Sequence, residues 1–128
     1  VVSGGITMSE EPSYGSDLRI KNSIDYDLAS YEAFFLALKP STFKYNKGTS
    51  GRKHFGFIAQ DVEQAMLDTG LMSDQLAALV KDPVKEILSD GITDYRYSIR
   101  YGELIALNTH MIQKLYQMVE ELLQQKEG

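Results

Sequence analysis

The C-terminal end of the chain carries the pattern that most limits its fold, a heptad repeat. From residue 102 onward, β-branched residues recur at every seventh position, and a second set, mainly leucine, falls three or four residues from them. The first set is Ile105, Ile112 and Val119, and the second is Tyr101, Asn108, Leu115 and Leu122. This spacing predicts one long helix over residues 102–127 whose apolar seam binds other helices. Asn108 is a polar seam residue of the kind that fixes register and oligomeric state.

The apolar stripe of this helix is wider than a two-stranded seam requires. Leu104, Met111 and Met118 lie on one side of the seam, and Tyr116 and Leu123 lie on the other. A helix that packs only on its own domain is the alternative. The heptad composition does not separate a dimer from a trimer, because β-branched residues paired with leucine slightly favour two strands.

Residues 28–60 predict a helix followed by a β-hairpin. A helix over residues 28–38 is indicated by an apolar stripe at three-to-four spacing, and Pro40 ends it. The residues of this stripe are Tyr31, Phe34, Phe35 and Leu38. Residues 41–45 alternate as a strand, glycine-containing turn residues follow, and residues 53–60 form the returning strand.

A short second helix is predicted at residues 61–68, with Asp61 as its cap. Its inward-facing residues are expected to be Val62, Ala65 and Met66. Residues 73–80 fit a helical turn or a buried strand, and we predict that their first half is helical. Asp82 and Pro83 are expected to break this element.

The remaining stretch before the long helix predicts short β elements. Residues 84–88 fit a strand or a turn, residues 89–91 a turn, and residues 95–99 a strand. Together the patterns predict an α+β fold. It is a small domain with a β-hairpin and short helices, plus a long C-terminal helix that forms a coiled-coil-like bundle.

The composition of the chain argues against several classes of function. A chain of 128 residues with 43% hydrophobic content supports one modest core, so we expect one domain plus an appendage. A net charge of −5 argues against a broad nucleic-acid-binding face. With no cysteine and two histidines far apart in the sequence, we expect neither a metal site nor a cofactor. No apolar run approaches the roughly 20 residues of a membrane span, so no membrane partner is expected.

One short stretch near the N-terminus carries the candidate chemistry. Ser16 and Lys21 place a hydroxyl and an amine five residues apart. A lysine activates a serine only when burial or a nearby positive charge, here Arg19, keeps the amine neutral. Residues at this spacing point to different faces of a helix or strand, so the pair requires a bend or a second chain. On the residues alone, a capping or turn serine and a solvated lysine are the simpler interpretation.

Two motifs carry a resemblance to a known family. Ser-Asp-Leu-Arg-Ile-Lys-Asn-Ser-Ile begins at Ser16, and His-Phe-Gly-Phe-Ile-Ala-Gln-Asp-Val-Glu begins at His54. Both resemble the C-terminal intramolecular chaperone domain of bacteriophage tail spikes, tail fibres and neck appendages, which myelin regulatory factors share. The resemblance implies a self-cleaving module that trimerises, helps the β-rich fibre upstream to fold, and then releases itself.

The resemblance also implies roles for individual residues. Ser16 would be the nucleophile, Lys21 the general base, and the peptide bond between Gly15 and Ser16 the bond that is cut. His54 would orient the hydroxyl, stabilise the oxyanion or keep the amine neutral, and these roles stay open. The supporting residues are Asp17, Arg19 and His54. The residues implied in oligomerisation are Ile105, Asn108, Ile112, Leu115, Val119 and Leu122.

The expected organisation follows from these implied roles. Residues 1–15 would be the remnant of a fibre and its linker, and residues 16–128 the chaperone and autoprotease domain, with 102–127 as its oligomerisation helix. The implied partners are two further copies in a homotrimer and the upstream fibre of the same polypeptide. The expected location is the host cytoplasm during virion assembly. A trimerisation cap that does not cut is the alternative function.

Overall fold

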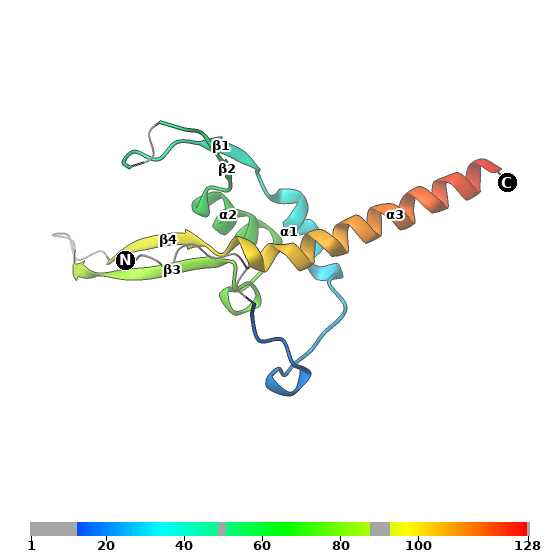
Figure 1. Ribbon diagram of the computed structural model, residues 1–128, viewed down its shortest axis with the longest axis horizontal. Helices are drawn as coiled ribbons and strands as arrows, with labels where there is room; N and C mark the ends of the chain where they lie inside the picture. The colour runs from blue at the N-terminus through cyan, green and yellow to red at the C-terminus, as the bar shows by residue number, and fades with distance from the viewer. Residues whose placement is uncertain (1–12, 49–50, 88–92, 128) are drawn as a thin grey trace.

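The computed structural model describes residues 13–48, 51–87 and 93–127, which form an α+β domain with one long projecting helix (Figure 1). The elements are α1 (Glu32–Ala37), β1 (Ser41–Phe43), β2 (His54–Gly56), α2 (Ala59–Thr69), β3 (Leu79–Ile87), β4 (Thr93–Ile99) and α3 (Ile105–Glu127). The strands pair as two separate antiparallel hairpins, β1–β2 and β3–β4. The predicted α+β class is confirmed.

The hydrophobic core lies where α1, α2 and the base of α3 meet. Its buried residues are Phe34, Val62, Ala65, Met66, Leu71, Leu76, Ala78, Leu104 and Leu107. Phe34 is completely buried, and Tyr31, Phe35 and Leu38 pack against this cluster. The predicted apolar stripe of the first helix and the inward face of the second are therefore confirmed. A helix as short as α1 depends on this packing, because its own backbone hydrogen bonds do not offset the cost of nucleation.

Helix α2 begins two residues earlier than predicted. Ile58 occupies the cap position without a side-chain bond, and Asp61 lies in the first turn of the helix, so the prediction of Asp61 as the cap was wrong. A carboxylate in the first turn still interacts favourably with the helix dipole. The helix ends at Thr69 and is capped by Gly70, whose φ of 76° places it in the left-handed region that glycine adopts without strain.

The prediction that Asp82 and Pro83 break the chain's second β region was also wrong. Strand β3 runs through both residues, and Pro83 lies opposite Tyr95 of β4. Every strand of a two-stranded sheet has a free edge, and proline is tolerated where its missing amide would face that edge or at a bulge. The register shifts between Pro83 and Ile87. The turn predicted at residues 89–91 lies outside the described residues.

The first hairpin is shorter than predicted, with three residues in each strand. Thr42 lies opposite Phe55, and Phe43 lies opposite His54. His54 and Gly56 are half-buried, whereas Phe55 is 88% exposed. His54 and Gly56 therefore lie on the inner face of this strand and Phe55 on the outer face.

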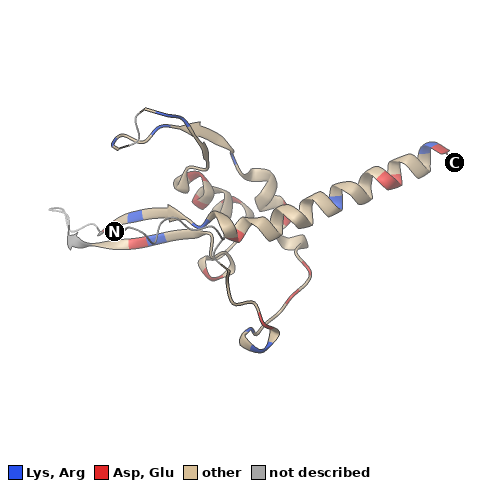
Figure 2. Ribbon diagram, in the orientation of Figure 1, with Lys and Arg blue, Asp and Glu red and all other residues tan. Residues whose placement is uncertain are grey.

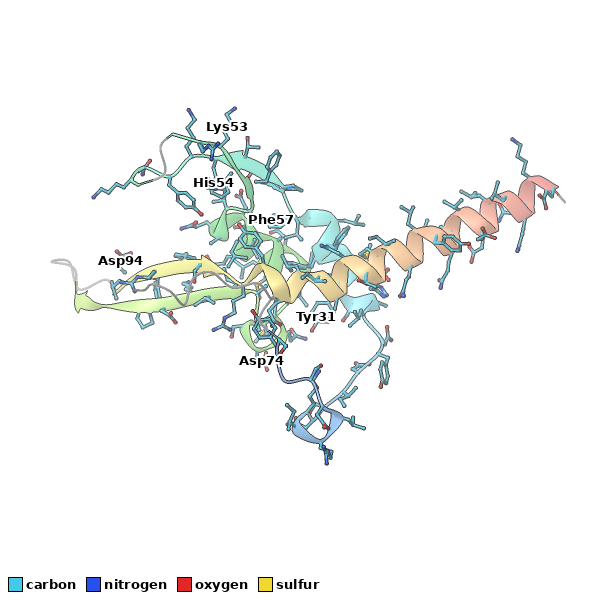
Figure 3. The ribbon with its side chains drawn as sticks, in the orientation of Figure 1. Tyr31, Lys53, His54, Phe57, Asp74 and Asp94 are labelled. Carbon is cyan, nitrogen blue, oxygen red and sulfur yellow. The ribbon has the colours of Figure 1, made fainter. Side chains whose placement is uncertain are left out.

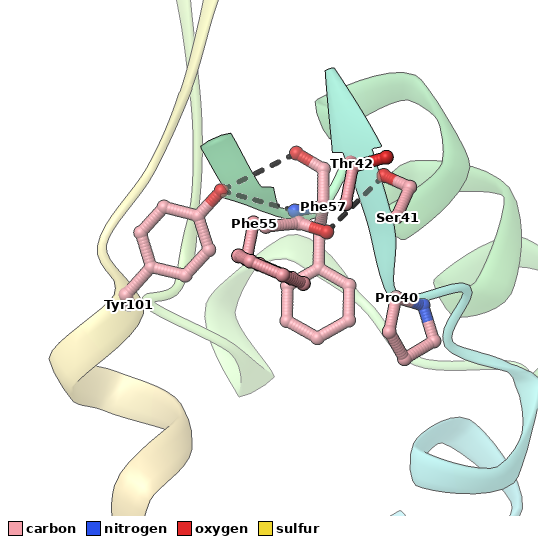
Figure 4. Close-up of a pocket in the computed structure, with 7 residues that line it drawn as sticks. Pro40, Ser41, Thr42, Phe55, Phe57 and Tyr101 are labelled. Atoms are coloured by element: carbon pink, nitrogen blue, oxygen red, sulfur yellow. Dashed lines mark hydrogen bonds between the residues drawn. The ribbon is translucent and has the colours of Figure 1, made fainter. Parts of the chain in front are cut away.

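Tyr101 joins the first hairpin to the base of α3 (Figure 4). Its hydroxyl oxygen accepts a hydrogen bond from the Phe57 amide at 3.0 Å and lies 3.4 Å from the Phe57 carbonyl, to which it donates. Gly56 makes this approach possible, because a Cβ there would overlap the Tyr101 hydroxyl. Tyr101 therefore anchors the domain internally, although the heptad pattern had grouped it with the seam residues.

Replacing Gly56 by alanine is expected to destabilise the fold by about 1–3 kcal/mol, the usual cost of forcing an extra methyl group into a packed site. The new methyl would displace Tyr101 and release the hairpin from α3. Thermal unfolding of both chains measures the difference. The control is Gly102→Ala, where a Cβ would meet nothing within 4 Å. Equal unfolding temperatures for the Gly56→Ala chain and the parent would contradict this account.

Helix α3 packs on its own domain only through its base. Leu104, at the end of the 3₁₀ turn just before the helix, and Leu107 are buried, and Met111 packs against the core. Beyond them the helix projects away from the domain (Figure 1). The apolar side chains of that stretch are exposed, and Ile112, for example, is 67% exposed. The same uncovered face includes Ile105, Leu115, Val119 and Leu122. The long helix is confirmed, and its predicted seam is free in the single chain.

Glu32 links α1 to α3 through His110 and Lys114. The Nε2 atom of His110 lies 2.9 Å from Oε2 of Glu32, and the Lys114 amine binds the other carboxylate oxygen of Glu32. All three side chains are partly buried. The Lys114 bond, with a smaller part from His110, lowers the pKa of the Glu32 carboxyl. Glu32 at the start of α1 thus holds two consecutive turns of α3.

The stability of the domain is expected to fall in acid in part through Glu32. A carboxyl whose pKa is lowered in the folded state contributes stability that is complete above its ordinary value of 4.5 and is lost as the pH falls through the lowered value. The free energies of unfolding of the parent and of Glu32→Gln, measured with urea across this pH range, should therefore converge at low pH. Glu103→Gln, which changes an exposed carboxyl, is the control. A difference in free energy of unfolding between the parent and Glu32→Gln that stays constant from neutral to acid pH would contradict this role of Glu32.

The described ranges lack two features that would point to particular functions. No helix among them is long and apolar enough to span a bilayer. Nor do these residues contain a cluster of histidine, aspartate and glutamate side chains that would hold a metal ion.

Candidate functional site

The first described segment, residues 13–27, is an exposed loop with a single 3₁₀ turn at Leu18–Ile20. Asp17 caps the turn, since its Oδ1 atom accepts a hydrogen bond from the Arg19 amide at 2.8 Å. Two backbone bonds close it, from the Ile20 amide to the Asp17 carbonyl at 3.1 Å and from the Lys21 amide to the Leu18 carbonyl at 3.2 Å. A capped turn of this kind reverses the chain within a few residues.

This reversal brings together the two residues that carry the candidate chemistry. The Lys21 amine donates a hydrogen bond to the Ser16 hydroxyl oxygen, with 2.6 Å between Nζ and Oγ. The sequence predicted that such a pair requires a bend or a second chain, and the Leu18–Ile20 turn supplies the bend. The peptide bond from Gly15 to Ser16 lies beside the pair. A Cβ on Gly15 would lie 3.2 Å from Cδ1 of Ile20, so the turn also folds back over this bond.

Arg19 holds the turn closed. Its Nε and Nη2 atoms bind the two carboxylate oxygens of Asp17 at 3.1 and 2.8 Å. This bond lowers the pKa of the Asp17 carboxyl, and the Arg19 backbone amide adds to the effect. The charge of Arg19 is therefore directed at Asp17 and not at the Lys21 amine. Asp17 and Arg19 support the site by fixing the turn.

His54 lies in a different part of the structure. Its ring stacks on Phe43 and meets Tyr45 edge-on, with ring centroids 6.1 and 5.0 Å apart. Its buried Nε2 atom has no hydrogen-bond partner in the described part of the chain. Figure 3 labels His54 on the first hairpin, on the opposite side of α3 from the blue turn that carries Ser16. A single chain therefore does not bring His54 to Ser16.

The segment around the Ser16–Lys21 pair exposes large apolar side chains. Tyr14 is 83% exposed, Leu18 70%, Ile20 67% and Tyr26 92%. The hydrogen bonds described for this segment are all local, between residues no more than five positions apart. Apolar side chains that are gathered on one exposed segment indicate an interaction surface. The pair is therefore preformed in the single chain, but open to water.

Sequence reasoning missed the roles of three residues that hold the long helix on the domain. Leu107, Glu32 and Tyr101 all act through contacts across the chain. Leu107 had a detectable signal, because Leu104, Leu107 and Met111 form a second stripe at three-to-four spacing beside the heptad. The contacts of Glu32 and Tyr101 span more than 40 residues, and no local pattern predicts them.

Comparisons with known proteins agree with the two motifs. Residues 16–71 match the model of the Peptidase_S74 family, described as the chaperone of endosialidase. The fold is similar to a crystal structure described as that of a novel intramolecular chaperon, with a TM-score of 0.62 and 28% identity. That likeness covers 80% of this chain and 99% of the other. A search of curated proteins found no significant match. The family match over residues 16–71 and the structural likeness together support a C-terminal intramolecular chaperone domain.

Proposed function

We propose that this chaperone domain cuts itself from the upstream polypeptide at the bond between Gly15 and Ser16. Ser16 is the nucleophile and Lys21 is the general base. The observation that carries the proposal is the 2.6 Å hydrogen bond between their side chains, within the range over which a proton is transferred. The peptidase name of the matching family supports the same class of reaction.

The reaction balances without a cofactor. The Ser16 hydroxyl attacks the Gly15 carbonyl carbon and gives its proton to Lys21, which passes a proton to the Ser16 nitrogen as the peptide bond breaks. The product is an ester between the Gly15 acyl group and the Ser16 oxygen. Water then hydrolyses the ester, which leaves a new carboxylate on Gly15 and a free amine on Ser16.

Assembly supplies the burial that the Ser16–Lys21 pair lacks in the single chain. An amine in water holds its proton near neutral pH, and an amine that is buried favours the neutral form that acts as a base. The pair is exposed in the single chain, and so is the apolar face of α3 that carries Ile112 and Leu115. We propose that three copies associate through this α3 face as a homotrimer, and that the assembly covers the pair. His54 of a neighbouring copy is then available as an oxyanion donor.

The chaperone role follows from the same order of events. Three α3 helices that associate first raise the effective concentration of the three upstream segments and set their register. Cutting afterwards removes the helper, so the folded fibre is held by a kinetic barrier. We place this process in the host cytoplasm during virion assembly, with the upstream fibre of the same polypeptide as the partner.

Intact mass of a longer chain with its upstream segment attached tests this function. The parent is expected to yield a fragment that begins at Ser16. Ser16→Ala is expected to stay whole, and the control Ser13→Ala, a serine three residues earlier on the same loop, is expected to cut like the parent. A parent that assembles but stays whole would favour the trimerisation cap that does not cut.

A further inference from the structure

Gly15 precedes the bond that we propose is cut, and its backbone conformation does not require glycine. Gly48, Gly51 and Gly70 have positive φ angles, whereas Gly15 lies outside the left-handed region. A residue with a side chain therefore adopts the backbone conformation of Gly15 without strain. The constraint on this position is instead the space around its Cα atom.

The side chain of Ile20 occupies that space. A Cβ atom on Gly15 would lie 3.2 Å from Cδ1 of Ile20. This distance is shorter than the roughly 3.5–4.0 Å of a favourable contact between two carbon atoms. An alanine methyl group at position 15 thus requires a small shift of the Ile20 side chain. A longer side chain requires a larger one.

The position of Ile20 is fixed by the backbone of the turn. Its amide donates a hydrogen bond to the Asp17 carbonyl at 3.1 Å, and the Lys21 amide donates one to the Leu18 carbonyl at 3.2 Å. Because isoleucine is branched at Cβ, its χ1 angle is stiff, and only the outer Cδ1 atom turns freely. A side chain longer than a methyl group at position 15 therefore displaces Ile20 as a whole, and Lys21 moves with it.

The charged side chains of the turn are directed at other partners. Arg19 pairs with Asp17, and Lys21 binds Ser16. Figure 2 shows both signs of charge on this turn, at the bottom of the view. Leu18 and Ile20 are the aliphatic residues of the turn and are exposed to a similar extent, 70% and 67%. Of these two side chains, only that of Ile20 lies within 4 Å of a Cβ atom on Gly15.

We propose that Ile20 determines which residue can precede the cut, and that it selects glycine and, less well, alanine. A larger residue at position 15 displaces Ile20 and moves the Lys21 amine away from the Ser16 oxygen, 2.6 Å from it in this structure. A misplacement of about 1 Å costs on the order of 10²-fold in rate. This inference rests on the proposed function and adds to it the substrate specificity of the cut.

The rate of cutting in four longer chains with the upstream segment attached tests this specificity. The chains are the parent, Gly15→Leu, Ile20→Ala and the double variant, and intact mass gives the cut fraction over time. Gly15→Leu is expected to cut about 10²-fold more slowly than the parent. In the Ile20→Ala background the same substitution should slow cutting by less than about 10-fold, because the obstructing side chain is gone. Any slowing by leucine or alanine alone cancels between the two ratios.

Leu18→Ala is the matched control, since it shortens the other aliphatic side chain of the turn. It should leave the slow cutting of Gly15→Leu unchanged. Gly15→Leu that cuts at the parent's rate would overturn this role of Ile20 alone, and so would a rescue by Leu18→Ala equal to that by Ile20→Ala. Slow cutting that Ile20→Ala does not relieve would overturn it as well. An assembled parent that stays whole would overturn the proposed function, and this inference with it.

Discussion

Replacing Lys21 by methionine is expected to slow the proposed self-cutting by about 10²–10⁴-fold, the usual contribution of a general base. Methionine keeps an unbranched apolar side chain of similar length but cannot accept the Ser16 proton. The Lys21 amine is the group within 2.6 Å of the Ser16 oxygen, so its loss leaves the hydroxyl without an acceptor at that atom. The fraction of cut chain over time, measured by intact mass on a chain with its upstream segment, gives the rate.

The matched control for this substitution is Lys126→Met, on an exposed lysine at the far end of α3. It removes one lysine without touching the turn and is expected to cut at the parent's rate. If Lys21→Met also cut at the parent's rate, Lys21 would not be the base, and the hydrogen bond to Ser16 would only stabilise the turn.

Aspartate in place of Ile112 or Leu115 is expected to weaken association by about 10²-fold or more, as for a central interface residue worth about 2–4 kcal/mol. Both side chains are exposed in the single chain, so the domain itself should fold as before. In the proposed trimer the same positions are buried, where an unpaired carboxylate is costly. Light scattering gives the mass of the assembly, and circular dichroism reports whether the domain is folded.

Gln113→Asp provides the control for this second prediction. Gln113 is exposed and lies on the outer side of the heptad, so its substitution adds the same charge without entering the seam. It should leave the mass of the assembly unchanged. Equal weakening by Gln113→Asp and Ile112→Asp would show that charge alone, and not the seam, controls association.

The parts of the fold that the sequence predicted are those set by local periodicity. The seven-residue pattern around Ile112 extends over several turns, so α3 was predicted nearly to its ends. The short stripe around Phe34 was enough for α1, because its buried partners lie on one face. The β3–β4 pair was not predicted because Pro83 lies within it and a proline usually breaks a strand. Whether a strand has a free edge that tolerates proline depends on the whole sheet, which the local sequence does not show.

The candidate site shows the same division between local and distant contacts. Ser16, Asp17, Arg19 and Lys21 lie within six consecutive residues, and a single capped turn arranges them, so a motif was sufficient to select them. His54 depends on how separate elements or copies are placed, which no sequence window contains. The turn capped by Asp17 explains why the pair forms at a spacing that suits neither a helix nor a strand.

The central claim is that assembly of the chaperone domain produces the cut before Ser16. The most direct test is the intact mass of the longer chain, with its oligomeric state measured on the same sample, for the parent and for Ile112→Asp. The account predicts that the assembled parent is cut between Gly15 and Ser16 and that the monomeric variant, with its Ser16–Lys21 turn intact, stays whole. A parent that assembles fully without being cut, or a folded monomer that cuts at the parent's rate, would contradict it.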